Sequence, residues 1–226
     1  MKIDLNRIAF IGRTFHEYSH MFGLDDDLLR GRVLDCPAGA SSFTAECIRQ
    51  GYDVTACDIL YDIEPGKLIK KARADTVYAL EQAYKVKDLY DWSFYGSVEE
   101  HAAQRMEALG HFSADFPTGI KEGRYVQGEL PRLPFDDDSF SLVLSSHFLF
   151  LYSDRLDFQF HFDCLKELLR VGEQVRVYPL AGLDGKQYPL LGNLLAALGT
   201  SGAKAHVRNT QFRFMREADR MLVLTR

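Results

Sequence analysis

The chain has 226 residues, 46% of them hydrophobic and 26% charged, which is the composition of an ordinary globular protein. This length suits one large domain, or one domain with an elaborate insertion. The formal net charge of −5 argues against a protein whose main partner is nucleic acid, because such proteins usually carry a basic patch. We therefore expect no nucleic-acid partner.

The spacing of the cysteines and the first residues of the chain indicate the cellular compartment of the protein. The four cysteines show no C-x-x-C spacing, which favours reduced, buried thiols and predicts no metal site. The start MKIDLNRIAF lacks the apolar region of a signal peptide. No segment approaches the roughly 18 uninterrupted apolar residues of a membrane span. We expect a cytoplasmic protein with no membrane partner, and the sequence does not reveal its oligomeric state.

The first predicted elements are a helix and a short strand. Helical spacing over residues 6–24 places apolar side chains on one face, namely Ile8, Ile11, Phe15, Tyr18 and Phe22. Gly23 is a plausible stop for this helix. Residues 31–36 then read as a buried strand, which Pro37 ends because proline cannot donate to a sheet ladder.

A strand–helix–strand unit follows. Residues 41–50 form the predicted crossover helix, which Gly51 closes, and residues 52–59 form the second strand. So short a unit implies two parallel strands with a right-handed crossover. The third strand is predicted only at 123–129.

The long interval before the third strand predicts an insertion at residues 62–118. One predicted helix covers 71–86 and another covers 97–110, where Ser97 and Glu100 fit a capping box and Gly110 marks the expected end. Between these helices stand Trp92, Phe94 and Tyr95. Those aromatic side chains either line a substrate pocket under a lid or merely anchor the insertion, because pockets and cores share that composition.

The remaining pattern completes an α/β fold within one domain, residues 1–226. The acidic run 136–138 is expected in a solvated loop. Strands and helices then alternate, with a strand opening 139–151, a helix at 154–171 closed by Gly172, a strand at 173–180, a helix at 188–202, and strands at 204–215 and 219–226 that form a hairpin. This order predicts a mostly parallel sheet with helices on both faces and an antiparallel strand at one side.

Three acidic residues stand at the ends of predicted strands. Asp35, Asp58 and Glu129 should line one crevice, because ligands of open parallel sheets bind outside the carboxyl ends of the strands. Asp58 follows Asp35 by 23 positions, near the spacing of the ribose-binding acid in dinucleotide folds. The turn between them carries only Gly39, whereas a pyrophosphate wants more bare backbone N–H groups. A ligand with adenosine but no phosphate needs fewer.

Three segments resemble the motifs of class I S-adenosylmethionine-dependent methyltransferases. They are VLDCPAGASSF, VTACDI and GELPRLPFDDDSFSLVLSSHFL, which occur in the family's order over residues 33–150. The resemblance implies a Rossmann-like, doubly wound sheet of seven strands in the order 3-2-1-4-5-7-6, with the last strand antiparallel. It also implies S-adenosylmethionine as cofactor.

The same resemblance implies roles for individual residues. Gly39 would let the backbone approach the methionine part of the cofactor, and Asp35 would order the turn and help hold the ammonium end. The base and sugar would be held by Asp58 at the ribose hydroxyls, Ile59 on the adenine, Glu129 at the adenine amino group and the Leu130 N–H at a ring nitrogen. Ser145 would border the methionine portion.

Some positions depart from the family pattern. Pro37 stands where the first glycine of the motif usually does, and Ser41 stands where the third does. Pro37 removes one N–H from the turn. Leu130 is larger than the common small residue. These departures affect the detailed pose of the cofactor.

His147 lies just past the fourth predicted strand, where the transferred methyl group should point, and is the candidate catalytic base. The segment SSHF lacks the Asn/Asp-Pro-Pro-Tyr/Phe pattern of amino-methylases of bases or glutamine. We therefore expect a small-molecule methyl acceptor. A non-catalytic S-adenosylmethionine-binding module is the main alternative, and a nicotinamide oxidoreductase would share the fold but lacks its G-x-G-x-x-G here.

Overall fold

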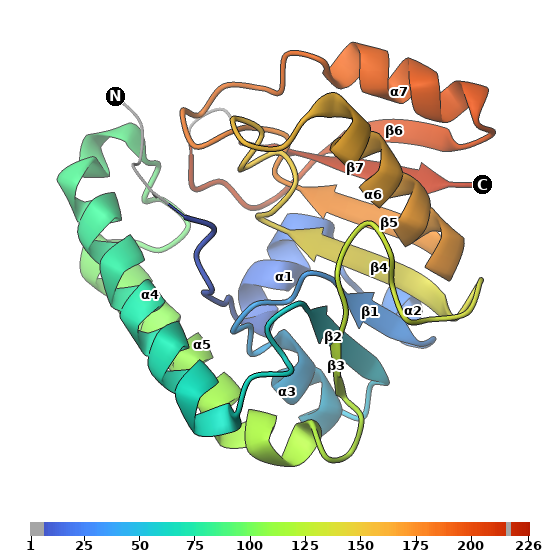
Figure 1. Cartoon of the computed structure of the whole chain (residues 1–226). Helices are drawn as coiled ribbons and strands as arrows, with labels where there is room; N and C mark the ends of the chain where they lie inside the picture. Colours follow the sequence, from blue (N-terminus) through green and yellow to red (C-terminus); the bar gives the residue numbers. More distant parts are fainter. Residues whose placement is uncertain (1–6, 216–217) are drawn as a thin grey trace.

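A computed structural model, which describes residues 7–215 and 218–226, has a seven-stranded sheet of order β3-β2-β1-β4-β5-β7-β6 at its centre (Figure 1). β1 to β5 pair in parallel, whereas β7 runs antiparallel to both β5 and β6. The predicted sheet order, the reversed last strand and the predicted hairpin of the last two strands are confirmed.

The strands follow hydrophobic runs of the sequence, apart from the exposed edge strand β6. β1 is short but central, and all three of its residues are buried between β2 and β4. The strands are β1 Val33–Asp35, β2 Val54–Asp58, β3 Tyr125–Gln127, β4 Phe140–Ser146, β5 Gly172–Tyr178, β6 Lys204–Asn209 and β7 Arg220–Thr225. Because β1 to β5 are parallel, their carboxyl ends meet at one edge of the sheet.

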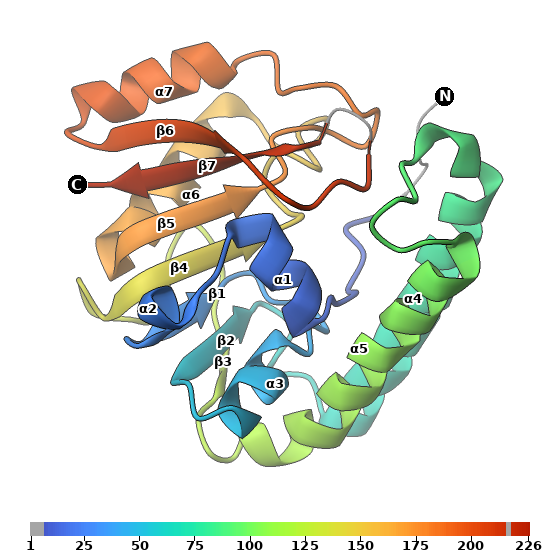
Figure 2. The ribbon, with the colours of Figure 1, turned by 180° about the vertical axis from the view of Figure 1, so that it is seen from behind.

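Helices cover both faces of this sheet. α6 and α7 pack on one face, and α1 and α3 pack on the other, as the two opposite views show (Figures 1 and 2). The helices are α1 Phe15–Phe22, α2 Asp26–Leu29, α3 Phe43–Arg49, α4 Pro65–Lys85, the 3₁₀ turn η1 Lys87–Leu89, α5 Val98–Gly119, α6 Phe158–Val171 and α7 Leu191–Thr200. Within the described residues, no helix is both long and apolar enough to cross a membrane.

The predicted N-terminal helix is wrong over its first half. Only Phe15–Phe22 is helical, and residues 7–14 are irregular. A reciprocal capping box decides the start, because the Thr14 hydroxyl accepts from the Glu17 N–H and the Glu17 carboxylate accepts from the Thr14 N–H at 2.8 Å. Gly23 ends the helix in the left-handed conformation, as predicted, with φ +58°.

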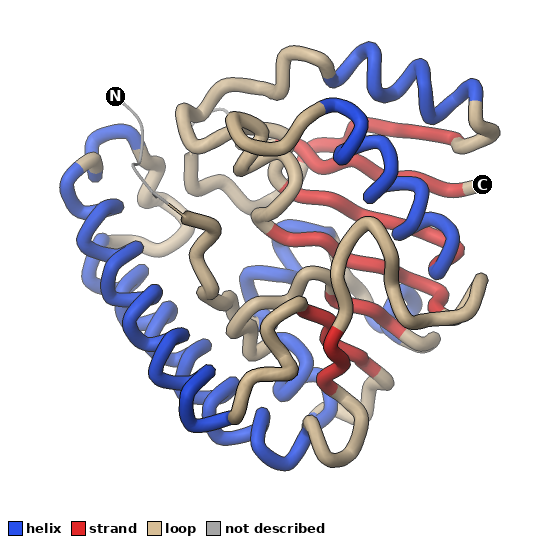
Figure 3. Tube along the Cα trace, viewed as in Figure 1, coloured by secondary structure: helices blue, strands red, loops and turns tan. Residues whose placement is uncertain are grey.

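The insertion is a long helical hairpin whose predicted helix bounds were too short (Figure 3). α4 begins at Pro65, ahead of the predicted start, because the Glu64 carboxylate accepts from the N–H groups of Gly66 and Lys67. α5 does not end at Gly110 but continues to Gly119. Gly110 is exposed and not in a left-handed conformation, so nothing there stops the helix.

The aromatic side chains between α4 and α5 anchor the insertion. Phe94 packs edge-on against Phe212 with ring centroids 4.6 Å apart, and Trp92 packs against Phe214 at 5.3 Å. The Tyr95 hydroxyl donates to Glu17 at 2.5 Å. Of the two roles left open by the sequence, the structure therefore favours anchoring the tip of the hairpin to α1 and to the segment before β7.

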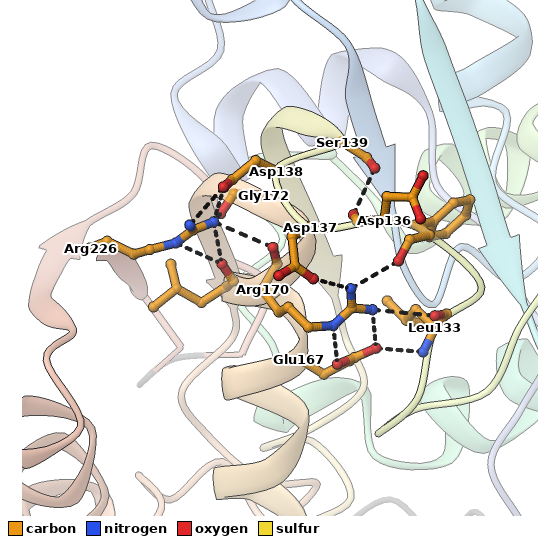
Figure 4. A network of polar contacts seen from close by, with 11 residues as sticks. Leu133, Asp136, Asp137, Asp138, Ser139, Glu167, Arg170, Gly172 and Arg226 are labelled. Carbon is orange, nitrogen blue, oxygen red and sulfur yellow. Dashed lines mark hydrogen bonds and ion pairs between the residues drawn. The ribbon is translucent and has the colours of Figure 1, made fainter.

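A surface network ties the loop before β4 to α6 and the C-terminus (Figure 4). Arg170 pairs with Asp137 at 2.7 Å and with Glu167 at 2.8 Å, and Arg226 pairs with Asp138. The acidic run predicted as a solvated loop is exposed, but two of its three residues are ion-paired. The network lies outside the pocket described below.

Candidate functional site

A cavity of about 500 Å³ opens at the carboxyl ends of the parallel strands. Most of its walls come from the turns after the strands, the α4–α5 hairpin and the irregular segment 8–13, and α1, α6 and the segment before β7 add further side chains. Figures 1 and 2 both show that segment running between the hairpin and the sheet. The volume lies within the usual range of small-molecule sites.

Six of the eight sequence-predicted site residues line this cavity, and two do not. The lining residues are Gly39, Asp58, Ile59, Glu129, Leu130 and His147. Asp35 and Ser145 are fully buried and do not line it.

The turn after β1 is built around Gly39, whose φ is +60°. Its N–H donates to the Asp58 carboxylate at 3.0 Å, and its carbonyl accepts from the Tyr61 hydroxyl at 2.8 Å. A Cβ at this position would lie 2.6 Å from the Ile11 carbonyl oxygen. Both the conformation and the close approach of segment 8–13 therefore require glycine here.

Asp58 ends β2 with only 6% of its surface exposed. Its two carboxylate oxygens accept from the N–H groups of Gly39 and Leu60, both at 3.0 Å. Burial raises the pKa of Asp58, while these two N–H groups and the charge of Lys71 oppose the rise. A carboxylate offers about four lone-pair sites, so Asp58 retains acceptor capacity toward the cavity.

Asp35 lies behind the cavity wall. The Tyr18 hydroxyl is 3.0 Å from both of its carboxylate oxygens. Burial raises the pKa of Asp35 well above its usual range, the Tyr18 hydrogen bond opposes the rise, and the nearby charge of Asp58 adds to it. Tyr18 itself lines the cavity, so Asp35 acts on the site through that side chain.

The end of β4 presents Ser146 and His147 to the cavity, rather than Ser145. The Ser145 hydroxyl is buried and has no hydrogen-bond partner in the described structure. The Ser146 hydroxyl lies 2.8 Å from His147 Nδ1. Alternation along β4 places Ser145 and Ser146 on opposite faces, and His147 lies beyond the strand in a left-handed conformation that departs from this alternation.

His147 adopts a positive φ of +53°, and its N–H donates to the Tyr178 carbonyl at 2.6 Å. Burial lowers the pKa of His147 well below its usual value, and the charges of Arg13 and Arg105 lower it further. The imidazole is therefore neutral at physiological pH and can donate at one nitrogen and accept at the other.

Ile59, Glu129 and Leu130 surround the mouth of the cavity. Ile59 is 44% exposed, which is unusual for an isoleucine directly after a central strand. Glu129 is exposed, and Leu130 is buried beside it. The Glu129 carbonyl accepts from the Arg132 N–H at 2.8 Å, whereas no hydrogen bond of the Leu130 N–H is found among the described residues. An apolar side chain beside such an N–H and an exposed carboxylate can hold a planar polar ring.

Segment 8–13 is the part of the site that sequence reasoning missed. The Phe10 N–H donates to the buried Asp75 carboxylate on α4 at 3.0 Å, and the Ala9 N–H donates to the Tyr152 hydroxyl at 3.1 Å. A Cβ on Gly12 would lie 1.9 Å from the Ala40 carbonyl oxygen. This segment, which we call the strap, is thus held by both the hairpin and the first turn. The Thr14-x-x-Glu17 pair was the readable signal that the helix starts after it.

A buried ionic cluster lies at the end of the strap. Glu17 is fully buried and pairs with Arg105 of α5, while Tyr95 and Thr14 donate to its carboxylate. Arg105 also donates to the Gly12 carbonyl. Although burial would raise the pKa of Glu17, the charges of Arg105 and Arg13 lower it, so Glu17 is ionised.

His101 of α5 also faces the cavity, with 6% of its surface exposed. Its Nδ1 is buried without a hydrogen-bond partner in the described residues. Burial, together with the charge of Arg105, lowers its pKa to about 3. The ring stacks on Phe214 with centroids 4.7 Å apart. The cavity thus holds two neutral imidazoles, of which the sequence predicted one.

Comparison with curated proteins assigns the chain to a family. No family model matches it. It is 32% identical over 225 residues to the uncharacterized protein MJ0045 of Methanocaldococcus jannaschii, with 99% of each chain covered. The chain belongs to the MJ0045 family.

Solved structures similar to this chain are more distant. A TehB-like SAM-dependent methyltransferase from Corynebacterium glutamicum is 17% identical with a TM-score of 0.45, covering 87% of this chain and 80% of that one. A putative methyltransferase of Haloferax volcanii, in complex with the Trm112 methyltransferase activator, is 12% identical with a TM-score of 0.49, covering 94% and 89%. At such identities, the activity has to be inferred from the cavity itself.

Proposed function

We propose that the chain is an S-adenosylmethionine-dependent methyltransferase acting on a small-molecule acceptor. The observation that carries this proposal is the meeting of Gly39, Asp58, Ile59, Glu129 and His147 in one cavity at the carboxyl ends of the strands. These residues come from four separate segments. Each of them stands where the motifs of class I methyltransferases have a contact to the cofactor or the acceptor.

The adenosine end of the cavity fits the cofactor. The spare lone pairs of Asp58 accept from the two ribose hydroxyls, and Ile59 supplies an apolar surface for the adenine. Glu129 accepts from the adenine amino group, and the Leu130 N–H donates to a ring nitrogen. The left-handed turn at Gly39 lets the methionine portion approach the backbone.

When bound, S-adenosylmethionine would supply an activated sulfonium methyl group for transfer to a lone pair of the acceptor. The chain's residues exclude water and orient the acceptor, and such orientation lowers a barrier by about 7–11 kcal/mol at best. The low pKa of His147 makes it a weak base. It therefore orients an acceptor N–H or O–H by hydrogen bonding.

Asp35 and Ser145 are the two predicted site residues that do not line the cavity. Asp35 fixes Tyr18, which borders the methionine portion, and thereby orders the turn. Ser145 is buried in β4, next to Ser146 and His147 in the sequence. Neither of the two side chains needs to touch the cofactor.

The hairpin supports a small acceptor. Residues 62–118 act as a lid within one domain, residues 1–226, and their side chains Leu80, Ala83 and Tyr90 close the cavity opposite the sheet. A cavity walled on both sides in this way suits a small molecule. A polymer would need an open groove.

A non-catalytic S-adenosylmethionine-binding module is the second candidate. One observation favours it: the Gly39 N–H is already committed to Asp58, and Pro37 has none, so the turn offers few donors to the methionine portion. A methyl-transfer screen over metabolite pools separates the two, because only the enzyme turns over labelled methyl groups.

Binding is tested by calorimetry with S-adenosylmethionine and S-adenosylhomocysteine. We expect Asp58→Ala to weaken both affinities about 10–100-fold, as expected for hydrogen bonds to a charged group. Asp62→Ala is the matched control, because Asp62 is exposed nearby and does not line the cavity. Absence of binding by the unmodified protein, or equal loss in both variants, would contradict the proposal.

A further inference from the structure

The strap end of the cavity, away from Asp58 and Glu129, holds two arginines beside one carboxylate. Arg13, on the strap, and Arg105, on α5, both line it. Glu17 is the acid next to them, and its carboxylate is already engaged by Arg105, Tyr95 and Thr14. Two arginines beside one carboxylate leave one surplus positive charge.

Arg13 is the arginine without a partner. No hydrogen bond or ion pair of its guanidinium is found among the described residues, and its Nε is enclosed without an acceptor. Its backbone is nevertheless fixed, because the Arg13 carbonyl accepts from the N–H of Ser42 at 3.1 Å and from the Ser41 hydroxyl at 3.0 Å. Burial and the charge of Arg105 lower the pKa of Arg13, and the charge of Glu17 opposes this shift without cancelling it.

The charge of Arg13 acts on the residues around His147 and on Tyr18, rather than on the adenosine end of the cavity. Its charge acts on His147, Tyr90, Tyr152 and Tyr178, where it lowers the pKa of the histidine and opposes the rise that burial causes in the tyrosines. It is not among the charges that act on the pKa of Asp58. All of these affected residues line the cavity.

Arg13 is half-buried, and partial burial of a charge without a partner is costly, so a ligand of opposite charge removes that cost. We infer that the methyl acceptor is a small carboxylate with an apolar or aromatic body, whose carboxylate pairs with Arg13. One surplus charge matches a carboxylate, whereas a phosphate monoester carries about −1.5 to −2. Tyr90, Phe214 and Met215 supply the apolar wall for the body.

This inference rests on the proposed function, because it names the acceptor of that same site. Its test uses the full chain saturated with S-adenosylhomocysteine. Calorimetry compares benzoate, phenylacetate and indole-3-acetate, each against its neutral primary amide. We expect at least one carboxylate to bind ten-fold or more tightly than its amide.

Substitutions assign that preference to Arg13. Arg13→Met should abolish the preference for carboxylate over amide while leaving S-adenosylhomocysteine affinity within twofold. Arg13→Lys, which keeps the charge, should restore part of it. Arg30→Met is the matched control, because Arg30 is exposed and lies outside the cavity, and it should keep the full preference.

Three outcomes would overturn the inference. One is that no carboxylate binds better than its amide. Another is that the preference survives Arg13→Met. The third is that Arg13→Met weakens S-adenosylhomocysteine but not 5′-methylthioadenosine, which lacks the amino-acid carboxylate, since Arg13 would then serve the cofactor. If the unmodified protein did not bind S-adenosylhomocysteine, that result would instead contradict the proposed function. The affinities of the ligand-free protein for each carboxylate and its amide would then test the inference separately.

Discussion

At the scale of single residues, the site is dominated by ionisable groups taken out of water. His101 and His147 are kept neutral by burial and by the arginine charges near them. The pKa of Asp35 shifts in the opposite direction, because burial favours the neutral carboxyl group and raises the pKa. Each shift also makes the free energy of unfolding depend on pH, because the folded and unfolded chains bind protons differently.

His101 gives a pH prediction with a definite sign. Its folded pKa of about 3 lies below the ordinary 6.5, so between these values the unfolded chain binds a proton that the folded chain does not. The stabilisation is complete above pH 6.5 and is lost as pH falls, by about 1.4 kcal/mol per unit. Urea unfolding should show His101→Gln lacking this slope, so that the gap between wild type and variant narrows by about 2 kcal/mol from pH 6.5 to 5.

The control for that experiment is His206→Gln, on the exposed face of β6. Its unfolding free energy should run parallel to that of the wild type. Parallel curves for His101→Gln as well would show that the His101 imidazole is hydrated in the folded protein.

At the scale of elements, the insertion shows how tertiary contacts override a local stop signal. Gly110 stands one residue past a predicted helix, yet α5 continues because its buried face, with Leu109, Phe112 and Phe116, packs against α4, Tyr61 and Tyr125. A helix gains stability from such an apolar face more than from intrinsic propensity. A glycine that is not in a left-handed conformation lowers the stability of a helix but does not end it.

Two glycines of α5 give opposite predictions. Gly110→Ala should raise the free energy of unfolding by about 0.5–1 kcal/mol, because nothing lies within 4 Å of the new Cβ and alanine favours helix. Gly119→Ala should lower it by about 1–3 kcal/mol, because its Cβ would lie 2.4 Å from the Tyr125 ring. Urea titration measures both. An equal effect of the two substitutions would contradict this packing.

At the scale of the whole molecule, the strap joins three bodies that are distant in sequence: the sheet, α1 and the hairpin. Asp75 on α4 holds the strap in place. The Asp75 carboxylate accepts from the Phe10 N–H and pairs with Lys71 and Arg7. Burial alone would raise the pKa of Asp75, but these three groups hold it low. Asp75 is therefore ionised and keeps all three partners at neutral pH.

Weakening the contacts between Asp75 and the strap should open the cavity. We expect Asp75→Asn to speed amide hydrogen exchange in residues 7–13 and in the adjoining turns of α4 about ten-fold, because the loss of charged hydrogen bonds costs roughly 1.5–3 kcal/mol. Asp53→Asn, at an exposed aspartate far from the strap, is the control. S-adenosylhomocysteine should slow exchange in the same segments of the wild type. Unchanged exchange in Asp75→Asn would show that Asp75 does not hold the strap in place.

The sequence by itself determined the alternation of strands and helices, the βαβ start, the hairpin of the last two strands and the acids at the strand ends. These are local features, because hydrophobic period and turn residues depend on neighbours along the chain. The sheet order came from the family resemblance. The same information placed Asp58, Glu129 and His147 at one edge, since parallel strands end together.

Only the tertiary structure decided the path of residues 8–13, the length of α5 and the pairing of Glu17 with Arg105. The spacing of Ile8 and Ile11 fits a helix, but their segment is held in an irregular path by Asp75, Tyr152 and the first turn. Arg13 and His101 are far apart in sequence from the acids of the motifs. No local period encodes such contacts, because their free energy arises from burying polar groups among partners that folding brings together.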